Sequence, residues 1–203
     1  MRSLLPETTV RNRWGEPAAL QDRMAHYQTP GVSLAVIHNG HLARARAFGV
    51  CEWGKPDPVT EETLFQAGSI SKPVFALAVM CLVQAGRLDL DADVNHSLTA
   101  WKIPANGDGQ PRVTLRQLLS HTAGLTVDGF PGYLRSAALP SLPQILDGQP
   151  PANSPPVRVD QVPGARCRYS GGGFTVAQQL VVDVLGKPFP ELMRELVLEP
   201  LGM

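Results

Sequence analysis

The sequence is poor in cysteine and has no excess of charge of either sign. Its three cysteines, Cys51, Cys81 and Cys167, match neither a disulfide framework nor the ligand spacing of a metal site, so we expect reduced thiols. Lysine plus arginine and aspartate plus glutamate number 18 each. The chain therefore lacks the basic excess with which proteins bind nucleic acid or an anionic membrane.

Long hydrophobic runs are also missing. The N-terminus has no apolar run of signal-peptide length, and no later window approaches the length of a membrane span. This predicts a soluble, cytoplasmic protein without a membrane partner. The 203 residues, of which 43% are hydrophobic, suffice for one sizeable domain or two small ones.

The stretch from Phe65 to Leu90 predicts a helix that is buried on most sides. Gly68 and Ser69 indicate its start, where the hydroxyl can cap a free backbone N–H, and Gly86 indicates its end. Apolar residues recur every three or four positions from Val74 onward. The expected inward face consists of Val74, Leu77, Ala78, Cys81, Leu82 and Ala85.

Ser69 and Lys72 form a candidate catalytic pair on this helix. Three positions apart, they share one face, whereas Ser71 points away from Lys72. A serine hydroxyl attacks once a base takes its proton, and a neutral lysine can be that base. The apolar helix and the positive end of its dipole favour the neutral amine. Another interpretation stays open, because Ser-x-x-Lys also arises by chance as a cap followed by a solvated charge.

The region before this helix predicts a helix and a hairpin. Residues Glu16 to Gln28 have a moderate helical pattern. Asn39-Gly40 is a strong signal for a tight turn, so Val32–His38 and His41–Val50 are expected to be antiparallel strands. The histidines beside the turn have no third ligand nearby, and we interpret them as a solvated hairpin tip.

Two segments after the Ser69 helix could carry function. Arg87 to Leu98 is acidic, but it lacks the glycine and the terminal glutamate of a calcium loop, so we predict no metal there. Thr114 starts a short helix with Leu115, Leu118 and Leu119 facing inward and Gly124 beyond its end. His121 follows that helix either as an acid or base or, the interpretation we favour, as a structural corner.

The remaining third of the chain predicts a loop and two helices. Gly129 to Gly164 is rich in proline and is expected to be a long ordered loop with one helical turn at Leu142–Leu146. Docking of this loop would use Val157, Val159 and Val162. The first helix contains Phe174, Ala177, Leu180, Val181 and Val184, and Pro188 opens the second, with Leu192, Met193, Leu196 and Val197. Tyr169 and the glycines at 171–173 precede the first helix, as an anchored turn or as a point of close approach for backbone or substrate.

Three elements, "SISK", "LLSHTAGL" and "RYSGGGF", stand in the order found in the serine β-lactamase and penicillin-binding-protein superfamily. The chain resembles the branch of class C β-lactamases, D-Ala-D-Ala carboxypeptidases, D-aminopeptidases and family VIII esterases, from about Gly31 to Met203. The resemblance implies an acyl-enzyme mechanism in which Ser69 attacks a carbonyl and Lys72 accepts or orients its proton. Tyr169 would be the companion base and would protonate the leaving group. The backbone N–H of Ser69 would be one oxyanion donor, and no metal or organic cofactor is implied.

The sequence departs from this family pattern in two places. Gly171, the expected substrate-binding position, stands where β-lactamases of the branch carry asparagine, which favours an esterase or peptidase. Relatives also continue past "PLGM" into further strands and a third motif. We therefore expect the N-terminal portion of a longer hydrolase, whose hairpin pairs with the missing C-terminal part or with another chain.

Together these observations predict an α/β (α+β) fold of the β-lactamase/transpeptidase type. Residues 1–67 would hold the helix and hairpin, and residues 68–203 a mostly helical lobe, as parts of one incomplete domain. The predicted function is a serine hydrolase that cleaves a small-molecule ester, amide or peptide through acyl-Ser69, as an esterase, D-amino-acid peptidase or β-lactamase-like enzyme. The alternatives are a non-catalytic binding domain of the same fold, an inactive fragment, and a metalloenzyme built on the five histidines.

Overall fold

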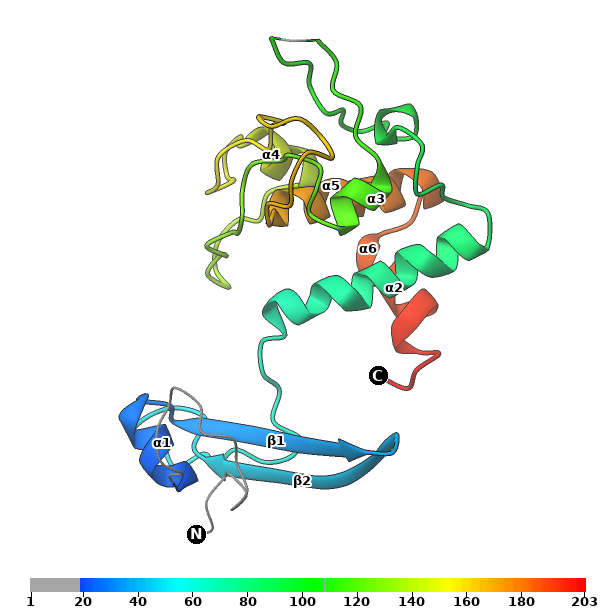
Figure 1. Ribbon diagram of the computed structural model, residues 1–203. Coiled ribbons are helices and arrows are strands. Elements are labelled where there is room, and N and C mark those ends of the chain that lie inside the picture. Colours follow the sequence, from blue (N-terminus) through cyan, green and yellow to red (C-terminus); the bar gives the residue numbers. More distant parts are fainter. Residues whose placement is uncertain (1–18, 108) are drawn as a thin grey trace. The chain divides into compact units, whose positions relative to one another are not determined.

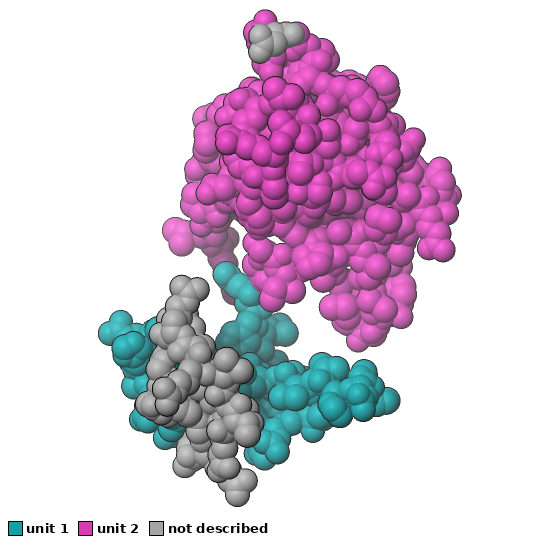
Figure 2. Space-filling view, viewed as in Figure 1, with its two compact units in different colours: residues 1–66 teal, residues 67–203 magenta. Residues whose placement is uncertain are grey.

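The computed structural model describes residues 19–107 and 109–203, which fall into two structural units, residues 1–66 and 67–203 (Figure 1, Figure 2). The predicted division of a single incomplete domain after residue 67 stays a prediction. In the described part of the chain, no helix combines the length and the apolar character that crossing a membrane requires.

The first unit consists of a short helix and a β-hairpin. Helix α1 spans Leu20–His26, and residues 16–18 of the predicted helix lie outside the described residues. Strands β1 (Gly31–His38) and β2 (His41–Gly49) pair antiparallel. Asn39 and Gly40 have φ angles of 50° and 77°, the left-handed pair of a type I′ turn. The predicted hairpin is confirmed.

Both faces of this hairpin are largely exposed. Its apolar side chains Leu34, Val36, Ile37 and Leu42 are between 37% and 64% exposed. Among the described residues the sheet has two strands, and a two-stranded sheet is marginally stable in water. His38 and His41 are exposed at the end of the hairpin, as expected of a solvated tip.

The second unit is built around helix α5, Gly171–Leu185. This helix packs against α3 (Leu115–Leu119), α4 (Leu142–Asp147) and α6 (Phe189–Met193), and Figure 1 shows it among them. Its buried side chains cover most of its circumference: Thr175, Val176, Ala177, Gln179, Leu180 and Val181. The 3₁₀ turn η2 (Val94–His96) adds Val94 to the same core, and the π-helix η3 (Arg194–Leu198) follows α6.

The helix with the candidate serine buries one face rather than most of its surface. A 3₁₀ turn, η1 (Gly68–Ile70), leads into α2 (Ser71–Gln84), and Gly86 follows its end with φ 67°, as predicted. The buried residues are Phe75, Ala78, Val79 and Leu82. The predicted inward face was therefore partly wrong, since Leu77 is 45% exposed and Ala85 is also exposed.

A single aromatic side chain explains how α2 is rotated. The Phe75 ring lies 6.1 Å from the Phe174 ring and 5.4 Å from the Phe189 ring, centroid to centroid. Because α2 is apolar on several sides, periodicity alone does not decide which stripe faces inward. Edge-to-face packing of these large rings decides it.

Helix α3 forms as predicted. Thr114 caps it, with a capping box to Gln117, and Leu115 and Leu118 are buried. The residue beyond its end that takes the left-handed conformation is His121, with φ 58°, in addition to the predicted Gly124.

The long loop docks on this core through two of its three predicted valines. Val157 and Val159 are buried, and Val159 forms a β-bridge with Leu125. The prediction for Val162 was wrong, since this side chain is 74% exposed. It lies three residues after the bridge, where the loop no longer contacts the core. The predicted helical turn is present as α4, one residue longer, with Ser141 as its cap.

The acidic segment after α2 uses its carboxylates within the fold. Asp93 accepts the backbone N–H of Asn95, and Asp91 forms a two-pronged ion pair with Arg116. Across residues 19–107 and 109–203, no group of three or more histidine, cysteine, aspartate or glutamate side chains is placed to hold a metal ion.

Candidate active site

Ser69 and Lys72 meet Tyr169, which lies a hundred positions from Ser69 in the sequence, in the second unit. The Ser69 and Tyr169 hydroxyl groups share a hydrogen bond of 2.7 Å, and the Lys72 amine donates to Ser69 Oγ at 3.3 Å. The Lys72 nitrogen also lies 4.9 Å from the centre of the Tyr169 ring. The serine hydroxyl is therefore in contact with a phenol and with an amine. The catalytic roles of the three residues stay a prediction.

The surroundings of Lys72 differ from the expected dry helix start. Ser69 is exposed and Lys72 is half-buried, because α2 begins at the surface of the unit. The lysine nitrogen faces two aromatic rings, Tyr169 at 4.9 Å and Phe174 at 5.6 Å from the ring centres. Ring faces attract a positive charge. The arrangement thus suits an ammonium that stabilises negative charge on its neighbours. The expected cap by the Ser69 hydroxyl is also absent among the described contacts of η1.

The two titratable neighbours of this lysine respond to it. The nearby Lys72 amine, and after it the hydrogen bond with Ser69, lowers the pKa of Tyr169. Burial lowers the pKa of His121, and the positive charge of Lys72 lowers it further. The phenol is therefore easier to ionise than an ordinary tyrosine, and the imidazole is easier to keep neutral.

The start of α5 holds Tyr169 in place. Ser170 is the N-cap of α5, since its hydroxyl accepts the Gly173 N–H at 2.9 Å and donates to the Thr126 carbonyl at 2.7 Å. The glycines at 171–173, expected to lie in the preceding turn, instead form the first turn of the helix. A Cβ on Gly172 would lie 2.8 Å from Val157 Cγ2, so glycine lets the helix start against the docked loop.

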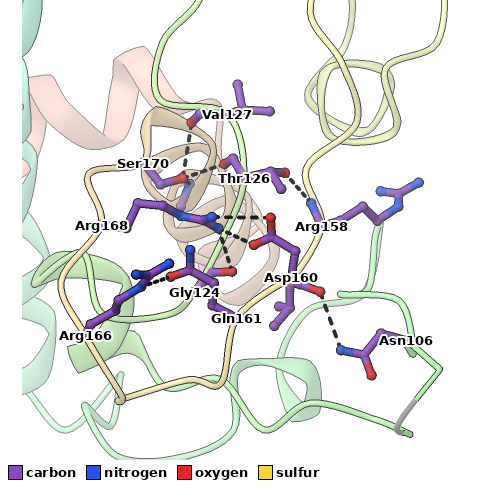
Figure 3. A network of polar contacts seen from close by, with 12 residues as sticks. Asn106, Gly124, Thr126, Val127, Arg158, Asp160, Gln161, Arg166, Arg168 and Ser170 are labelled. Carbon is purple, nitrogen blue, oxygen red and sulfur yellow. Dashed lines mark hydrogen bonds and ion pairs between the residues drawn. The ribbon is translucent and has the colours of Figure 1, made fainter.

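A network of polar contacts fixes the residue before Tyr169 (Figure 3). The Arg168 guanidinium pairs with Asp160 and also donates to the Gly124 carbonyl at 3.0 Å. The backbone N–H of Arg168 donates to the His121 carbonyl at 2.8 Å. Sequence reasoning missed Arg168 and Asp160. Arg168 directly precedes Tyr169, and Asp160 lies eight residues before Arg168, so the short spacing of these opposite charges could have indicated an ion pair beside the tyrosine.

A pocket of about 430 Å³ opens beside Ser69 and Lys72. Four aromatic side chains line it: Phe75, Phe130, Phe174 and Phe189. Asp128 and Gly171 also line it. None of the four phenylalanines was singled out as a site residue, because an apolar ring in a sequence is indistinguishable from a core residue.

Gly171 has no side chain, and its backbone N–H is used within the fold. Its backbone N–H already donates to the Asp128 carbonyl at 3.0 Å. A Cβ at this position would lie 3.0 Å from that carbonyl oxygen and 3.3 Å from Phe130 Cε2. The segment around Asp128 thus approaches too closely for a larger side chain to fit without a shift, which is a physical reason for glycine here. Its role in substrate binding stays a prediction.

Comparisons with known proteins show which family the sequence matches. The sequence model of a family described as Beta-lactamase matches residues 17–203. Esterase EstB of Burkholderia gladioli is 32% identical over 182 residues, covering 85% of this chain and 45% of that protein. Penicillin-binding protein 4 of Amycolatopsis lactamdurans is 30% identical over 177 residues, covering 87% of this chain and 44% of that protein.

A solved structure shows the same fold. EstCE1, described as a hydrolase with promiscuous acyltransferase activity, superimposes with a TM-score of 0.76 at 29% identity, covering 90% of this chain and 49% of that chain. The chain thus spans about half the length of the proteins that it matches.

Proposed function

Because the chain belongs to the Beta-lactamase family, we propose that it carries the nucleophile half of a serine hydrolase that cleaves esters or amides through an acyl-Ser69 intermediate. The observation that supports this most is the pair of hydrogen bonds at Ser69 Oγ, one to Tyr169 at 2.7 Å and one from Lys72 at 3.3 Å. A cap or a solvated charge needs neither bond, whereas an activated nucleophile needs a base within this reach.

In the proposed mechanism, Tyr169 is the base and Lys72 the fixed positive charge. The Tyr169 phenolate takes the proton of Ser69 as Oγ forms a bond to the substrate carbonyl carbon. The phenol then gives this proton to the leaving group as the bond to that group breaks, which leaves acyl-Ser69. Tyr169 then takes a proton from water as the water oxygen bonds to the acyl carbon. The bond from that carbon to Ser69 Oγ breaks, Tyr169 returns the proton to Oγ, and the acid leaves. The lowered pKa of Tyr169 supports its part, because it raises the phenolate fraction near neutral pH.

The backbone N–H of Ser69 is the oxyanion donor within this chain. It lies at the start of η1, where N–H groups have no partner within the helix. One such donor is worth about 3–4 kcal/mol in the transition state. A second donor, and strands that cover the exposed hairpin, are proposed to come from a further polypeptide segment that corresponds to the remaining half of the relatives.

The lining of the pocket supports an ester or amide with an apolar acyl group. Phe75, Phe130, Phe174 and Phe189 offer apolar ring surfaces. The names of two similar proteins, an esterase and a hydrolase with acyltransferase activity, are in line with acyl transfer.

The proposal is tested by hydrolysis of p-nitrophenyl esters and of nitrocefin by the purified chain. Ser69→Ala and Lys72→Ala should abolish hydrolysis of both kinds of substrate. Ser71→Ala is the matched control and should leave hydrolysis unchanged, because neither hydrogen bond at Ser69 Oγ involves Ser71. Hydrolysis that persists in Ser69→Ala would remove the assignment. A wild-type chain that turns over none of these substrates even when the proposed further segment is supplied would favour a binding domain of the same fold.

A further inference from the structure

His121 adopts a left-handed backbone conformation that glycine occupies at three other helix ends and Gln28 occupies at the end of α1. Its N–H bonds the Leu118 carbonyl at 3.3 Å, and the next N–H, of Thr122, bonds the Gln117 carbonyl at 2.9 Å. This is the Schellman pattern of a helix end, with His121 in the left-handed position at φ 58°. The helix ends at Gly86, Gly148 and Gly186 use glycine there, with φ between 63° and 67°. A Cβ is disfavoured in this conformation, and the contacts of the imidazole help to offset that strain.

Those contacts all lead to the residues around the proposed base. The imidazole stacks on the Tyr169 ring, with centroids 4.3 Å apart and planes at 31°. The imidazole Nδ1 accepts the backbone N–H of Ser170 at 3.1 Å. The backbone carbonyl of His121 accepts the N–H of Arg168 at 2.8 Å. The imidazole centroid also lies 5.2 Å from that of the Phe174 ring. One side chain thus touches Tyr169 and binds the backbone that follows it.

We propose that His121 is a positioning residue: its ring and its Nδ1 hold the Tyr169 phenol within hydrogen-bond reach of Ser69. The inference rests on the proposed function, since it assigns His121 a part in presenting the base. A glycine at this position would still allow the helix end and the carbonyl contact to Arg168. It would remove the stacked ring and the acceptor for Ser170.

This role requires the neutral imidazole with its proton on Nε2, because Nδ1 is an acceptor. The groups that face the ring are Lys72 from α2, Tyr169 and Ser170 before α5, and Phe174 from α5. Lys72 is the charged group among these described neighbours. Burial and that charge lower the pKa of His121, so the acceptor persists to lower pH than in a free histidine. Protonation would remove the acceptor and add a second positive charge beside Lys72.

The decisive variants are His121→Gly and His121→Asn, because both residues tolerate the left-handed conformation and the turn should still form. The first readout needs no activity. It is the alkaline absorbance titration of the three tyrosines, with Tyr169→Phe used to identify the signal of Tyr169. In His121→Gly the pKa of Tyr169 should rise toward its ordinary value of 10.0. The second readout is the rate at which a fluorophosphonate labels Ser69, which should fall about 10- to 100-fold, as for a misplaced catalytic group.

A second histidine and tyrosine pair in the chain provides the control. His26 and Tyr27 also have ring centroids 4.8 Å apart, but they lie in α1 and at its end. His26→Ala should change neither the titration of Tyr169 nor the labelling rate. Wild-type values of both readouts in His121→Gly would overturn the proposal.

A measurement on the unmodified chain completes the test. The ¹⁵N spectrum of the His121 ring at neutral pH should show an unprotonated Nδ1, and a proton on that nitrogen would overturn the proposal even if the variants failed to fold. If the spectrum and the Tyr169 titration behave as expected while Ser69 takes no label in the wild-type chain, the positioning contact holds and the proposed function fails.

Discussion

Replacing Tyr169 with phenylalanine should slow acylation strongly and leave stability almost unchanged. The ring can keep its 4.3 Å stacking on His121, while the 2.7 Å hydrogen bond to Ser69 disappears. Tyr169 is 44% exposed, so this bond is worth about 1 kcal/mol or less to folding. For a chain of this size, that lowers the melting temperature by about 2–4 °C. Loss of a general base costs about 10²- to 10⁴-fold in rate, equivalent to about 3–5 kcal/mol in the barrier.

The assay compares two measurements on the same samples. The rate of covalent labelling by a fluorophosphonate reports acylation, and calorimetric unfolding reports stability. A variant that labels at the wild-type rate would refute the role of the phenol. A variant that loses labelling together with its cooperative unfolding would show that Tyr169 acts in folding instead.

The remaining predictions concern stability. Gly172→Ala should lower the free energy of unfolding in urea by about 1–3 kcal/mol, because its Cβ would lie 2.8 Å from Val157, whereas Gly129→Ala, with nothing within 4 Å, should not. The Arg168 guanidinium lowers the pKa of Asp160, so the stability advantage of wild type over Asp160→Asn should be present above the ordinary aspartate pKa and vanish as pH falls through the lowered value. Because Asp160 is half-exposed, that advantage is about 1 kcal/mol or less in thermal melts, and an equal difference at all pH values would contradict it. The pKa of His121 in the folded chain is lowered from 6.5, so as pH falls the unfolded chain takes up a proton on this imidazole before the folded chain does. The contribution of the neutral imidazole to the free energy of unfolding should therefore be complete above pH 6.5 and decline below it. His121→Gly should lack this component of the pH dependence.

Local sequence signals predicted much of the fold. Asn39-Gly40 specified the hairpin turn, and Thr114 with Gln117 specified the start of α3, because each signal acts between neighbouring residues. The three-residue spacing of Ser69 and Lys72 predicted that their side chains would meet, and they do. The approach of Tyr169 was predicted by the family resemblance, since nothing local connects residues a hundred positions apart.

Features that depend on tertiary packing could not be predicted in this way. The rotation of α2 follows from the contact of Phe75 with Phe174 and Phe189, which no window of sequence contains. The exposure of Val162 follows from where the loop leaves the core. His121 looked like a helix-end corner, and the corner is present, but its ring contact with Tyr169 required the docking of α5.

The central claim is that Ser69 is the nucleophile, and locating a covalent adduct tests it most directly. The purified chain is treated with a fluorophosphonate, digested, and analysed by tandem mass spectrometry. We predict one phosphonylated peptide, modified at Ser69, that is absent in Ser69→Ala and present in Ser71→Ala. An adduct on Ser71 or elsewhere, or labelling of the wild-type chain that survives Ser69→Ala, would contradict the account.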